Sequence, residues 1–281
     1  MKRTIQYIEM ELAGLYPSNE IDGFKRIIFE TVCGWDFTEQ VIKKHEIISA
    51  TEFEKIEAIL LRLKNAEPIQ YILGETEFYG LKLKVNPSVL IPRPETEELV
   101  EWVLHSNLPK NYRILDIGTG SGCIAMAIKN QLKETKVSGM DISEKALETA
   151  RQNALENGLE VDFFQDDILN PKNLQEGMYD VIVSNPPYIM ESEKPRMHNN
   201  VLNFEPENAL FVPDVDPLVF YRAIAEFAKK YLSENGSLFF EINESLNTEM
   251  VDLLTGFGFS DIEIRKDING KNRMVRCKNK I

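Results

Sequence analysis

From residue 95 onward, short apolar segments alternate with amphipathic segments of helical periodicity, and this alternation is what most constrains the fold. Strands are predicted at Arg113–Ile117, Val137–Asp141, Val161–Gln165, Tyr179–Ser184 and Ser237–Ile242. Helices are predicted around them at residues 95–106, 121–133, 144–157, 217–233 and 245–256. Such an alternation favours an α/β fold of right-handed βαβ units, with a mostly parallel sheet covered on both faces. Residues 259–265 and 272–278 are predicted to pair as an antiparallel edge, which brings the sheet to seven strands.

The ends of several helices carry recognisable signals. Ser143 can cap the helix at 144–157, and Gly158 marks its end. Asp216 and Pro217 are predicted to be the cap and the first residue of the helix at 217–233, because proline is well tolerated at that position.

The segment that precedes the α/β region has a different character. Residues 1 to about 70 are predicted to form a small helical bundle, with one helix near Asn19–Val32 and a second opened by a capping box at Thr51–Glu54. Residues 71–93 alternate around glycines and are predicted to form a β-hairpin linker. We therefore expect a helical domain at 1–70, a linker at 71–93 and an α/β domain at 94–281.

Composition excludes several classes of function. The 281 residues carry a formal net charge of −13, which disfavours a nucleic-acid partner because such binding needs Lys and Arg to neutralise phosphates. Neither a signal peptide nor an apolar run of roughly 18 residues is present, so we expect a cytoplasmic protein with no membrane partner. Three scattered cysteines and three isolated histidines favour neither a disulfide framework nor a metal site.

A glycine-rich turn follows the first predicted strand of the α/β region, at Ile114–Gly122. Glycines there allow close approach of the backbone to a ligand, and Asp141 at the end of the next strand can accept both hydroxyls of a ribose. Those two features also fit NAD. Asp116 distinguishes between NAD and a sulfonium cofactor. An acid two residues before Gly118 suits a ligand that carries an ammonium and a sulfonium group better than one that carries a pyrophosphate. Asp167 and Ile168 would then flank the adenine.

The fourth predicted strand of this domain is followed by Asn185-Pro186-Pro187-Tyr188. Prolines lack N–H groups and hold φ near −65°, so this loop is stiff and presents carbonyl oxygens without competing donors. The Asn185 side-chain oxygen and the Pro186 carbonyl can each accept one hydrogen of an NH₂ group, while Tyr188 packs over its plane. No strong base is required, since the proton can leave to water after methyl transfer.

Together these motifs resemble the N-methyltransferases that act on glutamine, adenine or guanine. Four further segments narrow the resemblance to the release factor glutamine methyltransferases, namely Pro68–Gly74, Phe78–Gly80, Leu90–Glu97 and Phe204–Leu210. The resemblance spans nearly the whole chain. It implies a Rossmann-like class I methyltransferase domain that binds S-adenosylmethionine, and N5-methylation of the glutamine in the Gly-Gly-Gln loop of class 1 peptide chain release factors. The helical domain would help to hold this protein substrate, and the enzyme is expected to be a monomer.

Site residues follow from the motifs and the resemblance together. The cofactor-binding set is predicted to be Asp116, Gly118, Thr119, Gly120, Ser121, Gly122, Asp141, Asp167, Ile168 and Asn185. The residues predicted to hold the glutamine are Asn185, Pro186, Pro187 and Tyr188, of which Asn185, Pro186 and Tyr188 are also predicted to be catalytic. The Arg93–Glu97 segment is expected to border the cofactor pocket.

Two segments depart from the family pattern and two alternative functions stay open. Residues 211–216 replace a glycine-rich turn, and Asn243 stands where the family tends to have glycine, which leaves the loop shape and the substrate fit in doubt. The alternatives are a nucleic-acid amino-methyltransferase and a non-catalytic adenosine-binding scaffold.

Overall fold

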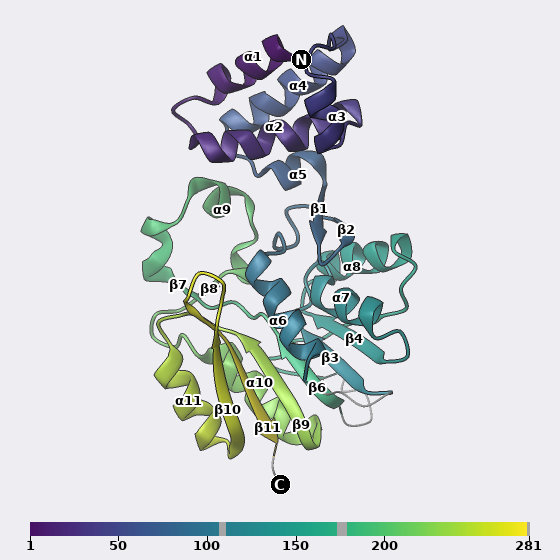
Figure 1. Cartoon of the computed structure of the whole chain (residues 1–281). Coiled ribbons are helices and arrows are strands. Elements are labelled where there is room, and N and C mark those ends of the chain that lie inside the picture. Colours follow the sequence, from purple (N-terminus) through teal and green to yellow (C-terminus); the bar gives the residue numbers. More distant parts are fainter. Residues whose placement is uncertain (107–110, 173–178, 280–281) are drawn as a thin grey trace. The chain divides into compact units, whose positions relative to one another are not determined.

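The computed structural model describes residues 1–106, 111–172 and 179–279, which form two compact units (Figure 1). The first unit comprises residues 1–74 together with 198–204, and the second comprises residues 75–197 and 205–281. Within the described ranges, no helix combines the length and the apolar character that crossing a bilayer requires.

The first unit is entirely helical, as predicted. Its helices are α1 (Lys2–Leu12), α2 (Ser18–Cys33), α3 (Phe37–Ile42), α4 (Ala50–Lys64), α5 (Ile69–Leu73) and α9 (Asn199–Phe204). The apolar faces of α1, α2 and α4 meet in one core that includes Ile8, Ile28, Phe29 and Ile56. Helical spacing of the apolar residues therefore produces this bundle.

Two predictions for this part of the chain are wrong in detail. The capping box of α4 lies at Ser49 and Glu52, two residues before the predicted one, because Ala50 and Thr51 already belong to the helix. Residues up to Leu73 in the predicted linker are helical in α5, which ends at Gly74 with a φ of 74°. Only residues 75–84 form the hairpin, as β1 (Glu75–Phe78) and β2 (Leu81–Lys84).

The second unit is built on a seven-stranded sheet in the order β10-β11-β9-β6-β3-β4-β5. Its strands are β3 (Arg113–Ile117), β4 (Lys136–Asp141), β5 (Asp162–Gln165), β6 (Tyr179–Ser184), β9 (Leu232–Glu241), β10 (Phe259–Lys266) and β11 (Asn272–Asn279). The five strands from β9 to β5 pair in parallel, and β11 pairs antiparallel with both β9 and β10. The predicted α/β class and the antiparallel edge are confirmed.

Helices cover both faces of this sheet (Figure 1). One face packs against α6 (Pro94–Leu104), α7 (Cys123–Gln131) and α8 (Glu144–Glu156). The other packs against α10 (Val219–Tyr231) and α11 (Asn247–Gly256). Between β6 and α10 the chain also forms the short parallel pair β7 (Ile189–Met190) and β8 (Phe211–Val212), with 3₁₀ turns at Glu191–Arg196 and Glu207–Ala209.

The predicted helix caps in this unit have mixed outcomes. Ser143 caps α8 as expected, since its hydroxyl accepts the Ala146 N–H at 3.2 Å. Asp216 does not cap α10, which begins two residues after Pro217, at Val219. Its carboxylate is instead held by both terminal nitrogens of Arg222, each at 2.8 Å.

Candidate active site

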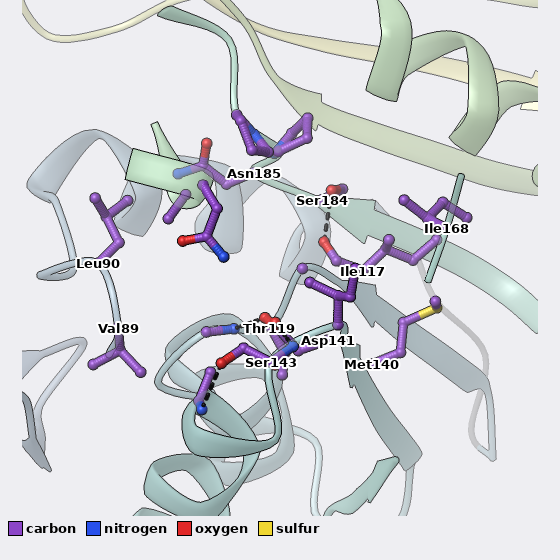
Figure 2. A pocket seen from close by; sticks show the side chains of 18 of the residues that line it. Val89, Leu90, Ile117, Thr119, Met140, Asp141, Ser143, Ile168, Ser184 and Asn185 are labelled. Atoms are coloured by element: carbon purple, nitrogen blue, oxygen red, sulfur yellow. Dashed lines mark hydrogen bonds between the residues drawn. The ribbon is translucent and has the colours of Figure 1, made fainter. Parts of the chain in front are cut away.

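A cavity of about 270 Å³ lies at the carboxyl ends of β3, β4 and β6 (Figure 2). Parallel α/β sheets place their ligands at this edge. Ten of the predicted site residues line this cavity: Gly118, Thr119, Gly120, Ser121, Asp141, Asp167, Ile168, Asn185, Pro186 and Pro187. Three predicted site residues, namely Asp116, Gly122 and Tyr188, do not line it.

The glycines of the turn after β3 have two different structural roles. Gly118 and Gly120 have φ angles of 72° and 55°, and nothing lies within 4 Å of the position that a Cβ would take at either. Gly122 is crowded instead, because a Cβ there would stand 3.0 Å from Phe163 and 3.1 Å from Ala150. The first two glycines leave the backbone open toward a ligand, whereas the third lets the start of α7 pack closely against its neighbours.

Asp141 ties the glycine-rich turn to the end of β4. Its Oδ2 accepts the Gly120 N–H at 2.9 Å, and its Oδ1 accepts the Ser143 N–H at 2.9 Å. Burial raises the pKa of this carboxyl, while these backbone donors favour its charged form. In Figure 2, Asp141 lies beside Thr119 and Ser143, across the cavity from Asn185. A carboxylate oxygen can accept more than one hydrogen, so Asp141 can also accept ribose hydroxyls.

Asp116 is completely buried beneath the turn. Its Oδ2 accepts the Thr119 hydroxyl at 2.6 Å and the Ala125 N–H at 3.3 Å, while its Oδ1 is buried without a partner. Desolvation raises the pKa of Asp116 to about 7, against its usual 3.8. The Asp116 side chain therefore stabilises the turn through Thr119 and Ala125. It does not line the cavity, where a ligand's ammonium group could contact it.

The buried Asp116 predicts a pH dependence of stability. Between pH 3.8 and about 7 the folded chain holds a proton on this group that the unfolded chain has lost. The stabilisation is complete below that range and is lost as the pH rises through 7, by at most about 1.4 kcal/mol per pH unit. Asp116→Asn lacks this titration. Between pH 5 and pH 7.5 the free energy of unfolding, measured by urea denaturation, should therefore fall more for the wild type than for Asp116→Asn. A difference between the two proteins that stays constant over this range would contradict the assignment.

The loop after β5 supplies a third side of the cavity. Asp167 and Ile168 both line it. Figure 2 shows Ile168 near Met140 and Ile117. Asp166 lines the cavity as well, and its buried carboxylate also holds the loop by accepting the Lys172 N–H at 3.0 Å.

Asn185, Pro186 and Pro187 form the wall contributed by the loop after β6. The Asn185 side-chain Nδ2 donates to the Thr96 hydroxyl at 3.2 Å. Tyr188 is not among the residues that line the cavity, and its hydroxyl donates at 3.0 Å to Glu241 at the end of β9. The carbonyl of Tyr188 accepts the Asn243 Nδ2 at 3.1 Å, so the residue that departs from the family pattern braces this loop.

Sequence reasoning did not single out several residues of the cavity wall. Thr96 lies in the predicted bordering segment and lines the cavity together with Arg93, whose guanidinium is 2.5 Å from the buried Glu205. Further lining residues lie outside the predicted site set, namely Val89, Leu90, Met140, Ser143, Ser184, Asn208, Phe220 and Ile224. Ser143 and Ser184 could have been found from their place at the ends of predicted strands. In the ranges that the structure describes, no group of three His, Cys, Asp or Glu side chains could hold a metal ion.

Comparison with known proteins agrees with this architecture. Residues 4–74 match the PrmC N-terminal domain, and residues 99–204 match the methyltransferase small domain. A methyltransferase from Pyrococcus furiosus shares the fold with a TM-score of 0.55, at 20% identity over 81% of this chain and 99% of that one.

Two curated relatives are more similar in sequence, and both are named release factor glutamine methyltransferase. The protein of Flavobacterium psychrophilum is 46% identical over 94% of each chain. That of Bacteroides thetaiotaomicron is 44% identical over 98% of this chain and 99% of its own. With this identity over nearly the full length of both sequences, the chain belongs to the release factor glutamine methyltransferase family.

Proposed function

We propose that this enzyme transfers a methyl group from S-adenosylmethionine to the side-chain amide N5 of the glutamine in the Gly-Gly-Gln loop of class 1 peptide chain release factors. Family membership supports the reaction and the substrate. One observation on this chain carries the proposal: Asn185, Pro186 and Pro187 line the same cavity as the glycine-rich turn and Asp141. The loop that can bind an amide therefore lies in the same cavity as the residues that can bind an adenosine.

The residues of the cavity fit S-adenosylmethionine. Asp141 can accept the ribose hydroxyls, and the open positions beside Gly118 and Gly120 admit close contact with the backbone. Ile117, Met140 and Ile168 offer apolar surface for a flat base. When bound, the cofactor supplies an electrophilic methyl group on a sulfonium.

The chain itself contributes positioning and electrostatics. An amide nitrogen is a weak nucleophile, because its lone pair is shared with the carbonyl. Asn185 Oδ1 and the Pro186 carbonyl can each accept one hydrogen of the substrate NH₂ group, which fixes the nitrogen and favours positive charge on it as the new bond forms. Alignment of this kind can supply about 7–11 kcal/mol at best. The proton then leaves to water.

Incubation of the purified chain with a full-length class 1 release factor and methyl-labelled S-adenosylmethionine tests the proposal. We expect one methyl group on the Gly-Gly-Gln glutamine, located by mass spectrometry of the peptides. The matched control is the same release factor with that glutamine replaced by glutamate, which lacks the amide nitrogen. Parallel reactions contain RNA or DNA instead. Label on nucleic acid alone, or equal label on the glutamate variant, would overturn the proposal.

A further inference from the structure

A buried chain of side-chain hydrogen bonds lies behind Asn185. At its centre is Glu241, the last residue of β9, which is 1% exposed and lies outside the cavity wall. Its Oε2 accepts the Thr96 hydroxyl at 2.7 Å, and its Oε1 accepts the Tyr188 hydroxyl at 3.0 Å. Thr96 is 2% exposed and in turn lies 3.2 Å from Asn185 Nδ2. Three separate segments, namely α6, β9 and the loop after β6, therefore meet at one carboxylate.

The chemistry of these groups decides which atom donates and which accepts in each of these hydrogen bonds. An ionised carboxylate only accepts hydrogen bonds, and a threonine hydroxyl has one hydrogen to donate. Because Thr96 donates that hydrogen to Glu241, its oxygen can only accept from Asn185. Asn185 must then present its NH₂ group to Thr96, which leaves Oδ1 as the end of the amide that is free to meet a ligand. In the part of the chain that the structure describes, no side chain or backbone group donates to Asn185 Oδ1.

The hydrogen-bond donors around Glu241 stabilise the charged form that this argument uses. Burial is the largest influence and raises the pKa of the Glu241 carboxyl above its ordinary value, with Glu95 adding to it, while the Thr96 and Tyr188 hydroxyls and Arg273 act in the opposite direction. The backbone carbonyl of Glu241 also accepts the Tyr221 hydroxyl at 3.0 Å, which fixes the end of β9 independently of the side chain. A buried carboxylate whose two oxygens each face a hydroxyl donor is well satisfied where it lies.

We propose that Thr96 and Glu241 are positioning residues, which fix the Asn185 amide with its oxygen toward the methyl-accepting NH₂ group. This inference rests on the proposed function of the site. A wrongly turned Asn185 would present its own NH₂ group to the NH₂ group of the substrate, so that two donors would face each other. The enzyme therefore needs a device that selects one of the two orientations of the asparagine amide, and a hydroxyl committed to a buried carboxylate provides it.

Three substitutions test the role of this chain of bonds. Thr96→Val keeps the shape but removes the hydroxyl, and should lower kcat about 10- to 100-fold because small misplacements near the reacting atoms have effects of that size. Thr96→Ser keeps the hydroxyl and should restore kcat to within about threefold of the wild type. Glu241→Gln can accept from only one of the two hydroxyls, so Thr96 is no longer forced to donate to it, and kcat should fall about 10-fold.

Tyr221→Phe is the matched control, because it removes a buried hydrogen bond to the same residue through the backbone alone. It should lower the melting temperature but keep kcat. The dissociation constant for S-adenosylmethionine, measured by calorimetry, should stay within about twofold in all four variants. The side-chain NH₂ signal of Asn185, assigned by its loss in Asn185→Ala, should shift in nuclear magnetic resonance spectra of Thr96→Val and stay in place in Tyr221→Phe.

Each result decides the question. A Thr96→Val enzyme with wild-type kcat, a Thr96→Ser enzyme as impaired as Thr96→Val, or an unshifted Asn185 signal overturns the positioning role. Loss of cofactor affinity in step with kcat overturns it too, since that would place Thr96 in cofactor binding. A wild-type chain that leaves the release factor unmethylated refutes the proposed function instead, and the Asn185 signal still tests the orientation in that case.

Discussion

Replacing Asn185 with alanine is expected to lower kcat for release factor methylation about 100- to 1,000-fold, the usual effect of removing one preorganised polar group from a reacting centre. The side chain lines the cavity, and Thr96 holds its nitrogen at 3.2 Å. Alanine removes the oxygen that accepts a substrate hydrogen but leaves the proline-stiffened backbone in place. Affinity for S-adenosylmethionine should fall only a few-fold, because Asp141 and the glycine-rich turn are unchanged.

Single-turnover kinetics with labelled cofactor, together with calorimetric titration of S-adenosylmethionine, measure the two quantities separately. Asn269→Ala, at an exposed position in the turn between β10 and β11, serves as the matched control and should keep both. If Asn185→Ala methylated the release factor at the wild-type rate, the assigned role of Asn185 would be wrong. An equal loss of cofactor affinity and rate would mean that the residue acts mainly in cofactor binding.

Asp141→Ala is expected to weaken binding of S-adenosylmethionine on the order of 100-fold or more, since hydrogen bonds to a charged group contribute about 1.5–3 kcal/mol each and two ribose hydroxyls lose their acceptor. The substitution also frees the Gly120 and Ser143 N–H groups, which the carboxylate holds at 2.9 Å each. The glycine-rich turn should therefore lose order as well as a ligand contact. Asp141→Asn, which retains one acceptor oxygen, should show an intermediate loss.

Equilibrium binding measured by calorimetry at pH 7.5 checks this expectation. Glu148→Ala is the control, because it removes one negative charge from an exposed position on α8, the helix that follows Asp141. Saturating cofactor should restore much of the turnover rate of Asp141→Ala, since Asn185 and Pro186 are untouched. Wild-type affinity in Asp141→Ala would exclude the ribose contact.

The sequence predicted the sheet better than it predicted the ends of the helices. The bounds of β3 and β6 agree with the prediction to the residue, because both strands are mostly apolar, are largely buried and are followed at once by motifs. The helix predicted at 217–233 ran too far at both ends, since β9 already begins at Leu232 and pairs there with Tyr179 of β6. Pairing across the sheet is a long-range effect that local periodicity does not report.

For the site, the sequence predicted which loops meet but not which side chains face inward. Motifs located the turn after β3 and the loop after β6, and both line the cavity. Within those motifs, spacing could not reveal that Asp116 turns into the core or that the Tyr188 hydroxyl is taken by Glu241. Both facts depend on contacts with Thr119, Ala125 and a strand about fifty residues away in sequence, which the folded chain alone brings together.

The connection between the two units has a structural consequence. Besides the link at Gly74 and Glu75, the chain enters the first unit again at His198 and leaves it at Phe204, so three peptide junctions join the units. The residue after the last junction is Glu205, whose carboxylate accepts the Ile91 N–H at 3.3 Å and pairs with Arg93 of the cavity wall. The residue that follows the last junction is therefore tied to the cavity wall by its ion pair with Arg93.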